Sequence, residues 1–320
     1  MGDSSSGESP IFFSPDTLRA LFITGPTAVG KTEIALQAAS FCNGEIIGAD
    51  AFQIYQGLDV LTAKPSRTDR QKIPHHLIDF VPSSREFDVS QYLDAALRCV
   101  NEITARGKLP IIAGGTGLYV RALTHGLSDL PRADAAIRAD LDAMPLEDLR
   151  LRYTALDPQG AAAIDLKNKR RLVRALEVSL LTGKPFSSFR DRWDTTPDSV
   201  HGLFLIRERD DLYARINRRV EEMFRNGVVR EVGATSDIGP TAAQAIGFKE
   251  IHSMIEGQIS ERECIEYVQQ ATRRYAKRQI TWFRSETVFE TVDLSLQHDP
   301  QFILQLIEKK ARAASASKEV

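Results

Sequence analysis

Residues 18–41 read LRALFITGPTAVGKTEIALQAASF. LRALFIT is a short apolar run of strand-forming residues, and Glu33–Phe41 carries apolar residues at helical spacing. Between them lies GPTAVGKT, Gly25–Thr32, a complete match to the phosphate-loop pattern. A strand, a glycine-containing loop and a helix in this order predict a phosphate-binding loop in an α/β protein.

The chemistry of this loop follows from its residue types. Glycines let successive backbone N–H groups turn toward phosphate oxygens, and the helix that begins near Lys31 adds the positive end of its dipole. Lys31 supplies a mobile charge, and the Thr32 hydroxyl can bind a Mg²⁺ ion that bridges two phosphates. The predicted phosphate-binding residues are Gly25, Thr27, Ala28, Val29, Gly30, Lys31 and Thr32. ATP is the default ligand of such a loop, and a pyrophosphate ester fits equally well.

Strand and helix patterns then alternate about every thirty residues, which predicts a parallel sheet. EIIGA from Glu45 and LPIIAGG before Thr116 are further strands, and a helical pattern ends before Gly107. The chain turns polar and helix-prone after Gly126, and GLFLI from Gly202 returns to the sheet. We therefore expect a P-loop α/β core with an inserted helical domain. The expected ranges are a disordered leader at 1–17, the core at 18–126 and 200–291, the insertion at 127–199 and a C-terminal tail at 292–320, whose last residues, ARAASASKEV, are expected to fray.

Two polar residues follow predicted strands. Ligands of open parallel sheets bind at the carboxyl ends of strands, so Asp50 is expected to face the phosphate site as a general base or a water-mediated metal ligand. Thr116 lies in the glycine-rich turn that ends the next strand, where its hydroxyl could donate a hydrogen bond. The alternatives are a turn-capping aspartate and a tight strand-to-helix turn.

The overall composition limits the classes of function. With 42% hydrophobic and 26% charged residues, the chain is neither extensively disordered nor fibrous. Its three cysteines form no metal-ligand spacing and no disulfide framework, which favours a reducing cytosol. No apolar run reaches the roughly 18 residues of a membrane-spanning helix. We expect a cytoplasmic monomer that does not contact a membrane.

The charge distribution bears on nucleic-acid binding. The total, 41 Lys+Arg against 43 Asp+Glu, argues mildly against a surface built as a whole to hold nucleic acid. Locally, Ala271–Arg284 has five basic residues, no acidic residue and three interleaved aromatics, a combination typical of binding to unpaired RNA bases. The alternative is a solvated basic stripe on a helix, and the same alternative applies to the basic cluster Lys167–Arg174.

Seven sequence blocks occur in an order that resembles one known family. They are GPTAVGKT, GADAFQIYQGLDVLTAKP, HHLIDF, AGGTGLYVRAL, KRRLVRALEV followed by TGKP, AIGFKEI and KRQITWFR. Together, from about Leu18 to Arg284, they resemble the tRNA dimethylallyltransferases, the tRNA isopentenyltransferase family. No Cys/His cluster follows Arg284, so the resemblance is to the bacterial type.

This resemblance implies a reaction and a set of site residues. The family transfers a dimethylallyl group from dimethylallyl diphosphate to the N(6) amine of the adenosine on the 3′ side of the anticodon. The loop would then hold the donor diphosphate with Mg²⁺ rather than ATP, Asp50 would be the general base, and Thr116 would lie at the reaction centre. Contacts with the tRNA anticodon stem-loop carry over onto Asp50, Ala51, Phe52, Gln53, Arg138, Arg170, Arg171, Leu172, Val173, Arg174, Gln244, Ala245, Ile246, Gly247, Phe248, Lys249, Lys277, Arg278, Gln279, Ile280, Thr281, Trp282, Phe283 and Arg284.

One residue departs from the family pattern, and other functions stay open. Ala51 stands where the family usually has serine, which leaves the base intact and affects only the positioning of the substrate. The alternatives are an adenylate isopentenyltransferase that acts on a free nucleotide, a small-molecule kinase, and a non-catalytic RNA-binding protein that senses a phosphate ligand. The basic-aromatic block and the long insertion favour tRNA, because a free nucleotide needs neither.

Overall fold

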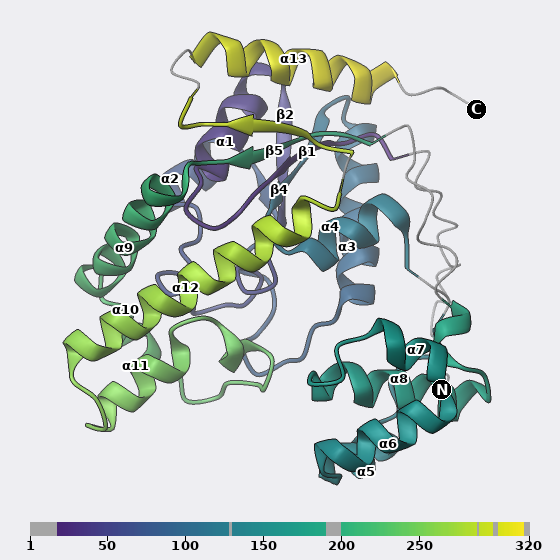
Figure 1. Ribbon diagram of the computed structural model, residues 1–320. Helices are drawn as coiled ribbons and strands as arrows, with labels where there is room; N and C mark the ends of the chain where they lie inside the picture. Colours follow the sequence, from purple (N-terminus) through teal and green to yellow (C-terminus); the bar gives the residue numbers. More distant parts are fainter. Residues whose placement is uncertain (1–17, 128–129, 190–199, 287, 297–299, 317–320) are drawn as a thin grey trace, which may run out of the picture. The chain divides into compact units, whose positions relative to one another are not determined.

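The computed structural model describes residues 18–127, 130–189, 200–286, 288–296 and 300–316 (Figure 1). The expected leader at 1–17 lies outside the described residues. Contacts divide the chain into two compact units, one made of Met1–Thr124 with Pro197–Val320 and the other of His125–Thr196. The second unit overlaps the expected insertion at 127–199, and each unit is described by itself below.

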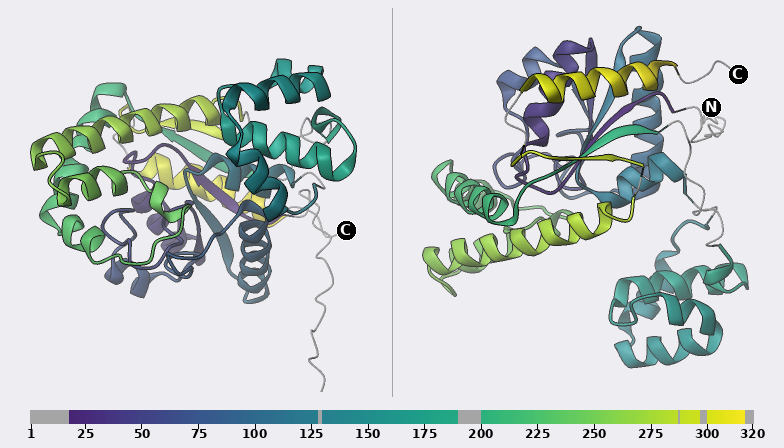
Figure 2. Two further views of the ribbon diagram at one scale, coloured as in Figure 1. Left: turned by 90° about the horizontal axis from the view of Figure 1, so that it is seen from below. Right: turned by 45° about the horizontal axis from the view of Figure 1, so that its top comes forward.

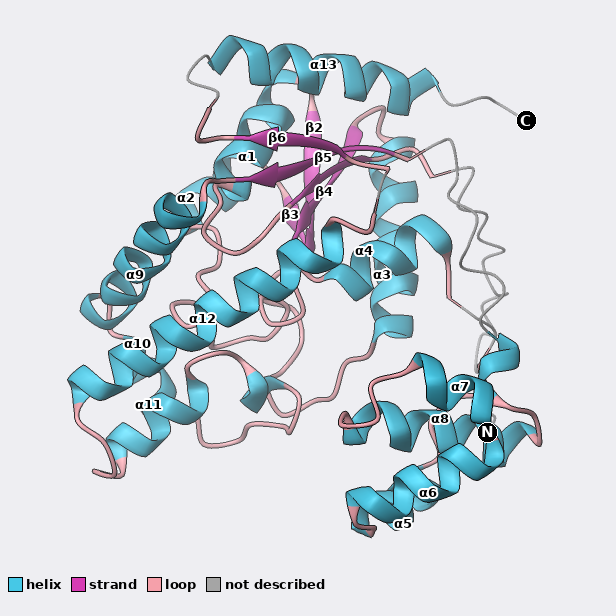
Figure 3. Cartoon of the chain, in the orientation of Figure 1, coloured by secondary structure: helices cyan, strands magenta, loops and turns pink. Residues whose placement is uncertain are grey.

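The larger unit is built on a parallel sheet of six strands among the described residues, in the order β3-β2-β4-β1-β5-β6 (Figure 3). The strands are β1 (Leu21–Thr24), β2 (Gly44–Ala49), β3 (His75–His76), β4 (Leu109–Gly114), β5 (His201–Ile206) and β6 (Glu290–Asp293). Every residue of β1 and β2 is buried, as expected for parallel strands that are covered on both faces. The predicted α/β class is confirmed.

The strand register brings three distant segments together. In the paired strands Thr24 lies opposite Gly114, and Gly114 lies opposite Ala49. The residues that follow these three therefore leave the sheet side by side at its carboxyl edge. They are the first residue of the phosphate loop, the glycine turn before Thr116, and Asp50.

Nine helices surround this sheet in the described part of the larger unit. They are α1 (Lys31–Phe41), α2 (Arg67–Lys72), α3 (Val89–Ala105), α4 (Gly117–His125), α9 (Arg209–Arg225), α10 (Val228–Gly233), α11 (Phe248–Ile255), α12 (Glu261–Phe283) and α13 (Pro300–Ala316). Capping boxes start two of the longest: Asp88 with Gln91 at α3, and Ser260 with Glu263 at α12. These reciprocal bonds satisfy backbone N–H groups that have no partner inside a helix.

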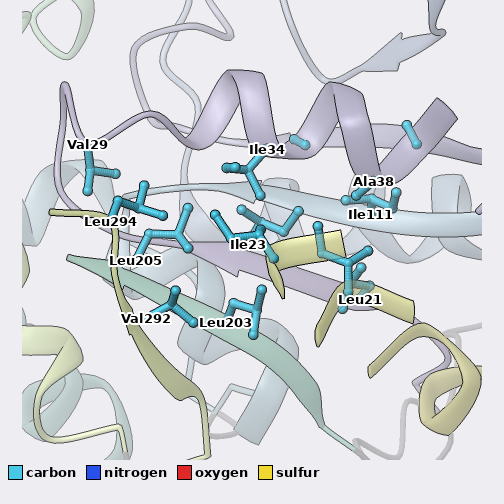
Figure 4. Packing of buried hydrophobic residues seen from close by; sticks show 14 of the residues in the cluster. Leu21, Ile23, Val29, Ile34, Ala38, Ile111, Leu203, Leu205, Val292 and Leu294 are labelled. Atoms are coloured by element: carbon cyan, nitrogen blue, oxygen red, sulfur yellow. The ribbon is translucent and has the colours of Figure 1, made fainter. Parts of the chain in front are cut away.

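The main core fills the space between the sheet and α1. Leu21 and Ile23 of β1 and Leu203 of β5 point into it together with Ile34 of α1 (Figure 4). All four are buried. This packing fixes α1, and with it the phosphate loop that α1 follows, against the centre of the sheet.

The fraying expected for the end of the tail, residues 311–320, is wrong for the part of it that the structure describes, because α13 runs to Ala316. β6 adds an edge strand to the sheet, and α13 packs on β1, β5 and α1. Ile303, Ile307, Ala311 and Ala314 are buried, and their spacing forms one apolar helical stripe. Composition misled the prediction because the small and charged residues near the end hide this periodicity.

The smaller unit contains helices joined by loops, and no strand, in its described residues, as the sequence predicts (Figure 2). Its elements are α5 (Ala135–Ala143), α6 (Leu146–Leu156), α7 (Pro158–Ala163), α8 (Lys169–Thr182) and the 3₁₀ turn η2 (Phe186–Phe189). Leu149, Tyr153 and Leu172 form its core, and the buried Asp157 accepts hydrogen bonds from the backbone of Gly160 and Ser187. These contacts give the unit a core of its own.

Because Ile307 is fully buried in the main core, Ile307→Ala should destabilise the protein. The loss of buried methyl groups and the cavity left behind lower the free energy of unfolding by about 2–5 kcal/mol. Urea unfolding followed by circular dichroism measures the change. The exposed Gln305→Ala on the same helix is the control and should change it by less than about 0.5 kcal/mol. Equal stability of the two variants would mean that α13 is detached in solution.

Candidate active site

The phosphate loop has the backbone that its glycines predict. Gly25 and Gly30 both have positive φ angles, 152° and 114°. A Cβ atom on Gly25 would lie 2.6 Å from the carbonyl oxygen of Leu205, so only glycine fits there. Gly30 is the residue before α1, and the first N–H groups of that helix therefore open toward the loop.

Lys31 is folded back onto this loop. Its Nζ donates hydrogen bonds to the carbonyl oxygens of Gly25 (2.9 Å) and Pro26 (2.7 Å). Burial lowers the pKa of Lys31 to about 7; Asp50 opposes this shift and the nearby Arg219 adds to it. The amine is thus held in a poorly solvated site where an anion would favour its charged form.

A cavity of about 420 Å³ opens beside the loop. Its polar lining residues include Lys31, Thr32, Asp50 and three arginines of α9, and its apolar ones include Ile46, Ile78 and Pro65. The described residues that line it also include Thr27, Ala28, Gly30, Gln53, His75, Gly114, Glu222 and Gln279. Basic and apolar side chains therefore both line the cavity.

Sequence reasoning missed the arginines of α9. Arg215, Arg218 and Arg219 line the cavity, and the Arg215 Nε donates to the carbonyl oxygen of Ala28 at 2.9 Å. Burial lowers the pKa of Arg219, and Asp50 opposes that shift. The sequence could have indicated these arginines by their helical spacing in the segment after β5, because the carboxyl end of β5 lies next to that of β1.

Asp50 is held in a fixed turn at the cavity wall. Its Oδ1 accepts hydrogen bonds from the backbone N–H groups of Phe52 (2.9 Å) and Gln53 (3.3 Å). The side chain of Gln53 in turn donates to the carbonyl oxygens of Thr62 and Ala63. Asp50 therefore caps its turn and also lines the cavity, so a turn-capping role and a role in the site are compatible for this residue.

Thr116 holds both peptides that flank Asp50. Its N–H donates to the carbonyl oxygen of Ala49 at 3.1 Å, and its Oγ1 accepts from the N–H of Ala51 at 2.9 Å. The second bond uses the backbone of Ala51, so alanine in place of the usual serine preserves it. The structure thus brings Thr116 next to Asp50, which lines the cavity.

Among the stretches expected to meet tRNA, Asp50–Gln53 is half-buried throughout, and the others differ in exposure from residue to residue. The exposed residues in these stretches are Lys249, Lys277, Arg278, Thr281, Arg284, Arg170 and Arg171. The buried residues are Leu172, Val173, Ala245, Gly247, Phe248, Gln279 and Phe283. In the smaller unit, Arg138 and Arg174 pair with the buried Glu177. A direct contact with RNA is therefore compatible with only part of each stretch.

The described residues lack two other kinds of feature. No helix among them is both long and apolar enough to cross a bilayer. No three of their His, Cys, Asp and Glu side chains cluster as a metal site would require.

The fold and the loop define a P-loop α/β protein whose cavity is lined by Lys31 and three arginines. Residues 53–286 match the family model described as IPP transferase, and the chain belongs to this family. The predicted family is thus confirmed, and with it the class of enzyme, a transferase.

Named relatives and solved structures agree with this assignment. The chain is 42% identical to the tRNA dimethylallyltransferase of Geobacter sulfurreducens, over 88% of this chain and 94% of the relative. It is 38% identical to that of Akkermansia muciniphila, over 90% and 97%. A crystal structure of the tRNA isopentenylpyrophosphate transferase of Bacillus halodurans superposes with a TM-score of 0.70 at 36% identity, covering 94% of this chain and 98% of that one. A eukaryotic dimethylallyltransferase described as acting on tRNA gives a TM-score of 0.74 at 26% identity, covering 92% and 77%.

Since the pKa of Lys31 is lowered to about 7, diphosphate binding should weaken as the pH rises above 7. The anion binds the protonated amine, so binding above that pH requires uptake of a proton. The affinity for dimethylallyl diphosphate should fall by up to about tenfold per pH unit between pH 7 and 9.

Titration calorimetry of the wild type and of Lys31→Arg measures this dependence. A guanidinium stays charged throughout this range, so the variant should show only the titration of the ligand itself. The same pH profile in both proteins would contradict the role assigned to Lys31.

Proposed function

We propose that this chain transfers a dimethylallyl group from dimethylallyl diphosphate to the N(6) amine of the adenosine 3′-adjacent to the tRNA anticodon and releases diphosphate. One observation carries the proposal: the phosphate loop and the carboxylate of Asp50 face the same cavity. It is supported by the membership of the chain in the IPP transferase family and by relatives named tRNA dimethylallyltransferase.

The cavity suits an allylic diphosphate donor. Lys31, Arg215 and Arg219 line it, and negative charge grows on the leaving diphosphate as the allylic bond breaks. Groups that are fixed before the reaction stabilise such charge most effectively. The apolar lining residues Ile46 and Ile78 suit the five-carbon group, which a nucleoside triphosphate site would not require.

Mg²⁺ fits the available oxygen donors. The Thr32 hydroxyl lines the cavity beside Lys31, and Mg²⁺ commonly takes its remaining ligands from phosphates and water rather than from a protein cage. When bound, the ion would neutralise part of the diphosphate charge. Thr32 is the residue that we propose as its protein ligand.

Asp50 is the proposed general base. The exocyclic amine of adenine is a weak nucleophile, so a carboxylate beside it assists by accepting the proton as the new C–N bond forms. Thr116 fixes the peptides on both sides of Asp50 and so orients this carboxylate. An adenine stacked in the anticodon loop could not enter the cavity, so it must turn out of the stack.

RNA binding is assigned to the exposed side of α12. Lys277, Arg278 and Arg284 are exposed there, within two turns of the residues that touch the cavity. Their charges would hold backbone phosphates of the anticodon stem-loop. We propose that the protein acts in this way as a cytoplasmic monomer.

A transfer assay with the full chain tests the reaction itself. Labelled dimethylallyl diphosphate, Mg²⁺ and an anticodon stem-loop are incubated with the enzyme, and label should enter the RNA at the adenosine beside the anticodon. A stem-loop with guanosine at that position is the matched control. Label found only in free AMP would indicate an adenylate isopentenyltransferase, and phosphate transfer from ATP without prenyl transfer would indicate a kinase.

Asp50→Asn should lower kcat of this transfer by a factor of about 10² to 10⁴, because the amide cannot accept the proton. Asparagine retains an oxygen that can accept the turn hydrogen bonds of Phe52 and Gln53, so the fold should persist. Single-turnover transfer rates measure the change. The control, Asp94→Asn at an exposed position of α3, should be silent. A near-normal rate in Asp50→Asn would remove this residue from the proton transfer.

Replacing Lys277 and Arg278 by alanine should weaken stem-loop binding and flatten its dependence on salt. The logarithmic slope should fall by about one unit for each lost phosphate contact. Fluorescence anisotropy at several salt concentrations measures it. The double variant Arg98→Ala with Lys309→Ala removes the same charge from exposed positions on α3 and α13. An equal effect of both double variants would contradict a defined RNA surface on α12.

A further inference from the structure

The last two turns of α12 have two chemically different sides. Lys277, Arg278 and Thr281 are exposed, whereas Ala276, Gln279 and Phe283 are buried. Polar Gln279 is the exception on the buried side, with only 5% of its surface exposed. A buried amide is stable only when it is hydrogen-bonded, so its partners indicate its role.

Both ends of the Gln279 amide bond to backbone groups at the cavity. Its Oε1 accepts a hydrogen bond from the N–H of Thr27 (2.8 Å), and its Nε2 donates to the carbonyl oxygen of Gly115 (2.8 Å). The first partner can only donate and the second can only accept, which fixes the orientation of the amide. Gln279 thus joins the phosphate loop to the turn that contains Thr116.

This contact holds one particular peptide of the phosphate loop. The carbonyl of Pro26 accepts a hydrogen bond from Lys31 Nζ at 2.7 Å, while the N–H of the same peptide, on Thr27, donates to Gln279. With both polar groups engaged, the peptide cannot rotate without breaking both hydrogen bonds. The direction of the following N–H groups in the loop depends on its orientation.

The neighbouring residues of α12 pack on the same turn. A Cβ atom on Gly115 would lie 2.3 Å from Gln279 Nε2, and one on Gly117 would lie 2.4 Å from the ring of Trp282. Burial raises the pKa of Tyr275, although its hydrogen bonds to Thr116 and Gln279 oppose that shift. The buried side of α12 therefore fits closely against the turn that orients Asp50.

We propose that Gln279 is a positioning residue: it holds the Pro26–Thr27 peptide in the conformation that binds diphosphate, and it ties that loop to the helix whose exposed side binds RNA. The inference deepens the proposed function and rests on it for the identity of the donor. Gln279 was expected among the residues that meet tRNA. Its buried contacts assign it to the donor side instead.

The test compares Gln279→Met with wild type. Methionine is unbranched and of similar size, but it can neither accept from Thr27 nor donate to Gly115. The Kd of inorganic pyrophosphate with Mg²⁺ should rise about 5- to 100-fold, as expected for the loss of one to two hydrogen bonds to buried groups. The KM of dimethylallyl diphosphate should rise in parallel, and the Kd of the stem-loop should stay within about twofold. Gln270→Met, exposed on the same helix, is the matched control.

Gln279→Glu gives a readout that a purely structural role would not produce. When protonated, the introduced carboxyl group can accept from Thr27 and donate to Gly115, but when ionised it cannot donate and it repels the diphosphate. The ratio of its pyrophosphate Kd to that of wild type should therefore fall toward one between pH 8 and pH 5.5. This ratio cancels the titration of the ligand, and the variant also serves if Gln279→Met does not fold.

Three results would overturn the proposal. They are a pyrophosphate Kd in Gln279→Met within twofold of wild type, a selective loss of RNA affinity, and a ratio for Gln279→Glu that does not change with pH. Failure of the proposed function is distinguishable, because pyrophosphate binding is measured without RNA and without transfer. A wild type that binds pyrophosphate but transfers no dimethylallyl group would contradict the function alone, whereas one that binds no pyrophosphate would contradict the role of Gln279 as well.

Discussion

The parallel pairing of β1 with β4, and of β4 with β2, is the constraint on which the site depends. It aligns Thr24, Gly114 and Ala49, so the phosphate loop, the Thr116 turn and Asp50 leave the sheet at one level. A shift of one residue along either pair would move Asp50 by about 3.3 Å and turn its side chain to the other face of the sheet. Thr116 secures this register beyond the strands through its bonds to Ala49 and Ala51.

The charges at this edge stabilise one another only partly. Asp50 favours the charged forms of both Lys31 and Arg219, yet burial lowers the pKa of each, and the two cations also oppose one another. Asp50 and Glu222 both favour the charged form of Arg219 while burial opposes it, and an anionic ligand would stabilise these cations further. The charges that line the cavity are those that the proposed diphosphate site requires.

The parts of this site that sequence could predict are those with a local signature. The phosphate loop, the strand before Asp50 and the glycine turn at Thr116 each lie within one short segment, so their residue types and spacing suffice. Arg219 and Gln279 lie 188 and 248 residues beyond Lys31, and only the folded sheet brings their helices to the loop. The role of Gln279 was also hard to predict from the sequence, because this residue lies within the basic stretch Ala271–Arg284. Packing in the folded protein decides which side of the helix it occupies.

The basic residues of α12 differ in their exposure to solvent. The segment Ala271–Arg284 carries five basic residues, but they do not all face solvent. Arg273 is half-buried, donates a hydrogen bond to Asn217 at 2.6 Å and lies 6.0 Å from the ring of Tyr213. The exposed basic residues are Arg274, Lys277, Arg278 and Arg284.

A patch of four exposed cations on a chain with a net charge of −2 favours phosphates at one place without attracting nucleic acid over the whole surface. Behind this patch, Gln279 links the same helix to the phosphate loop.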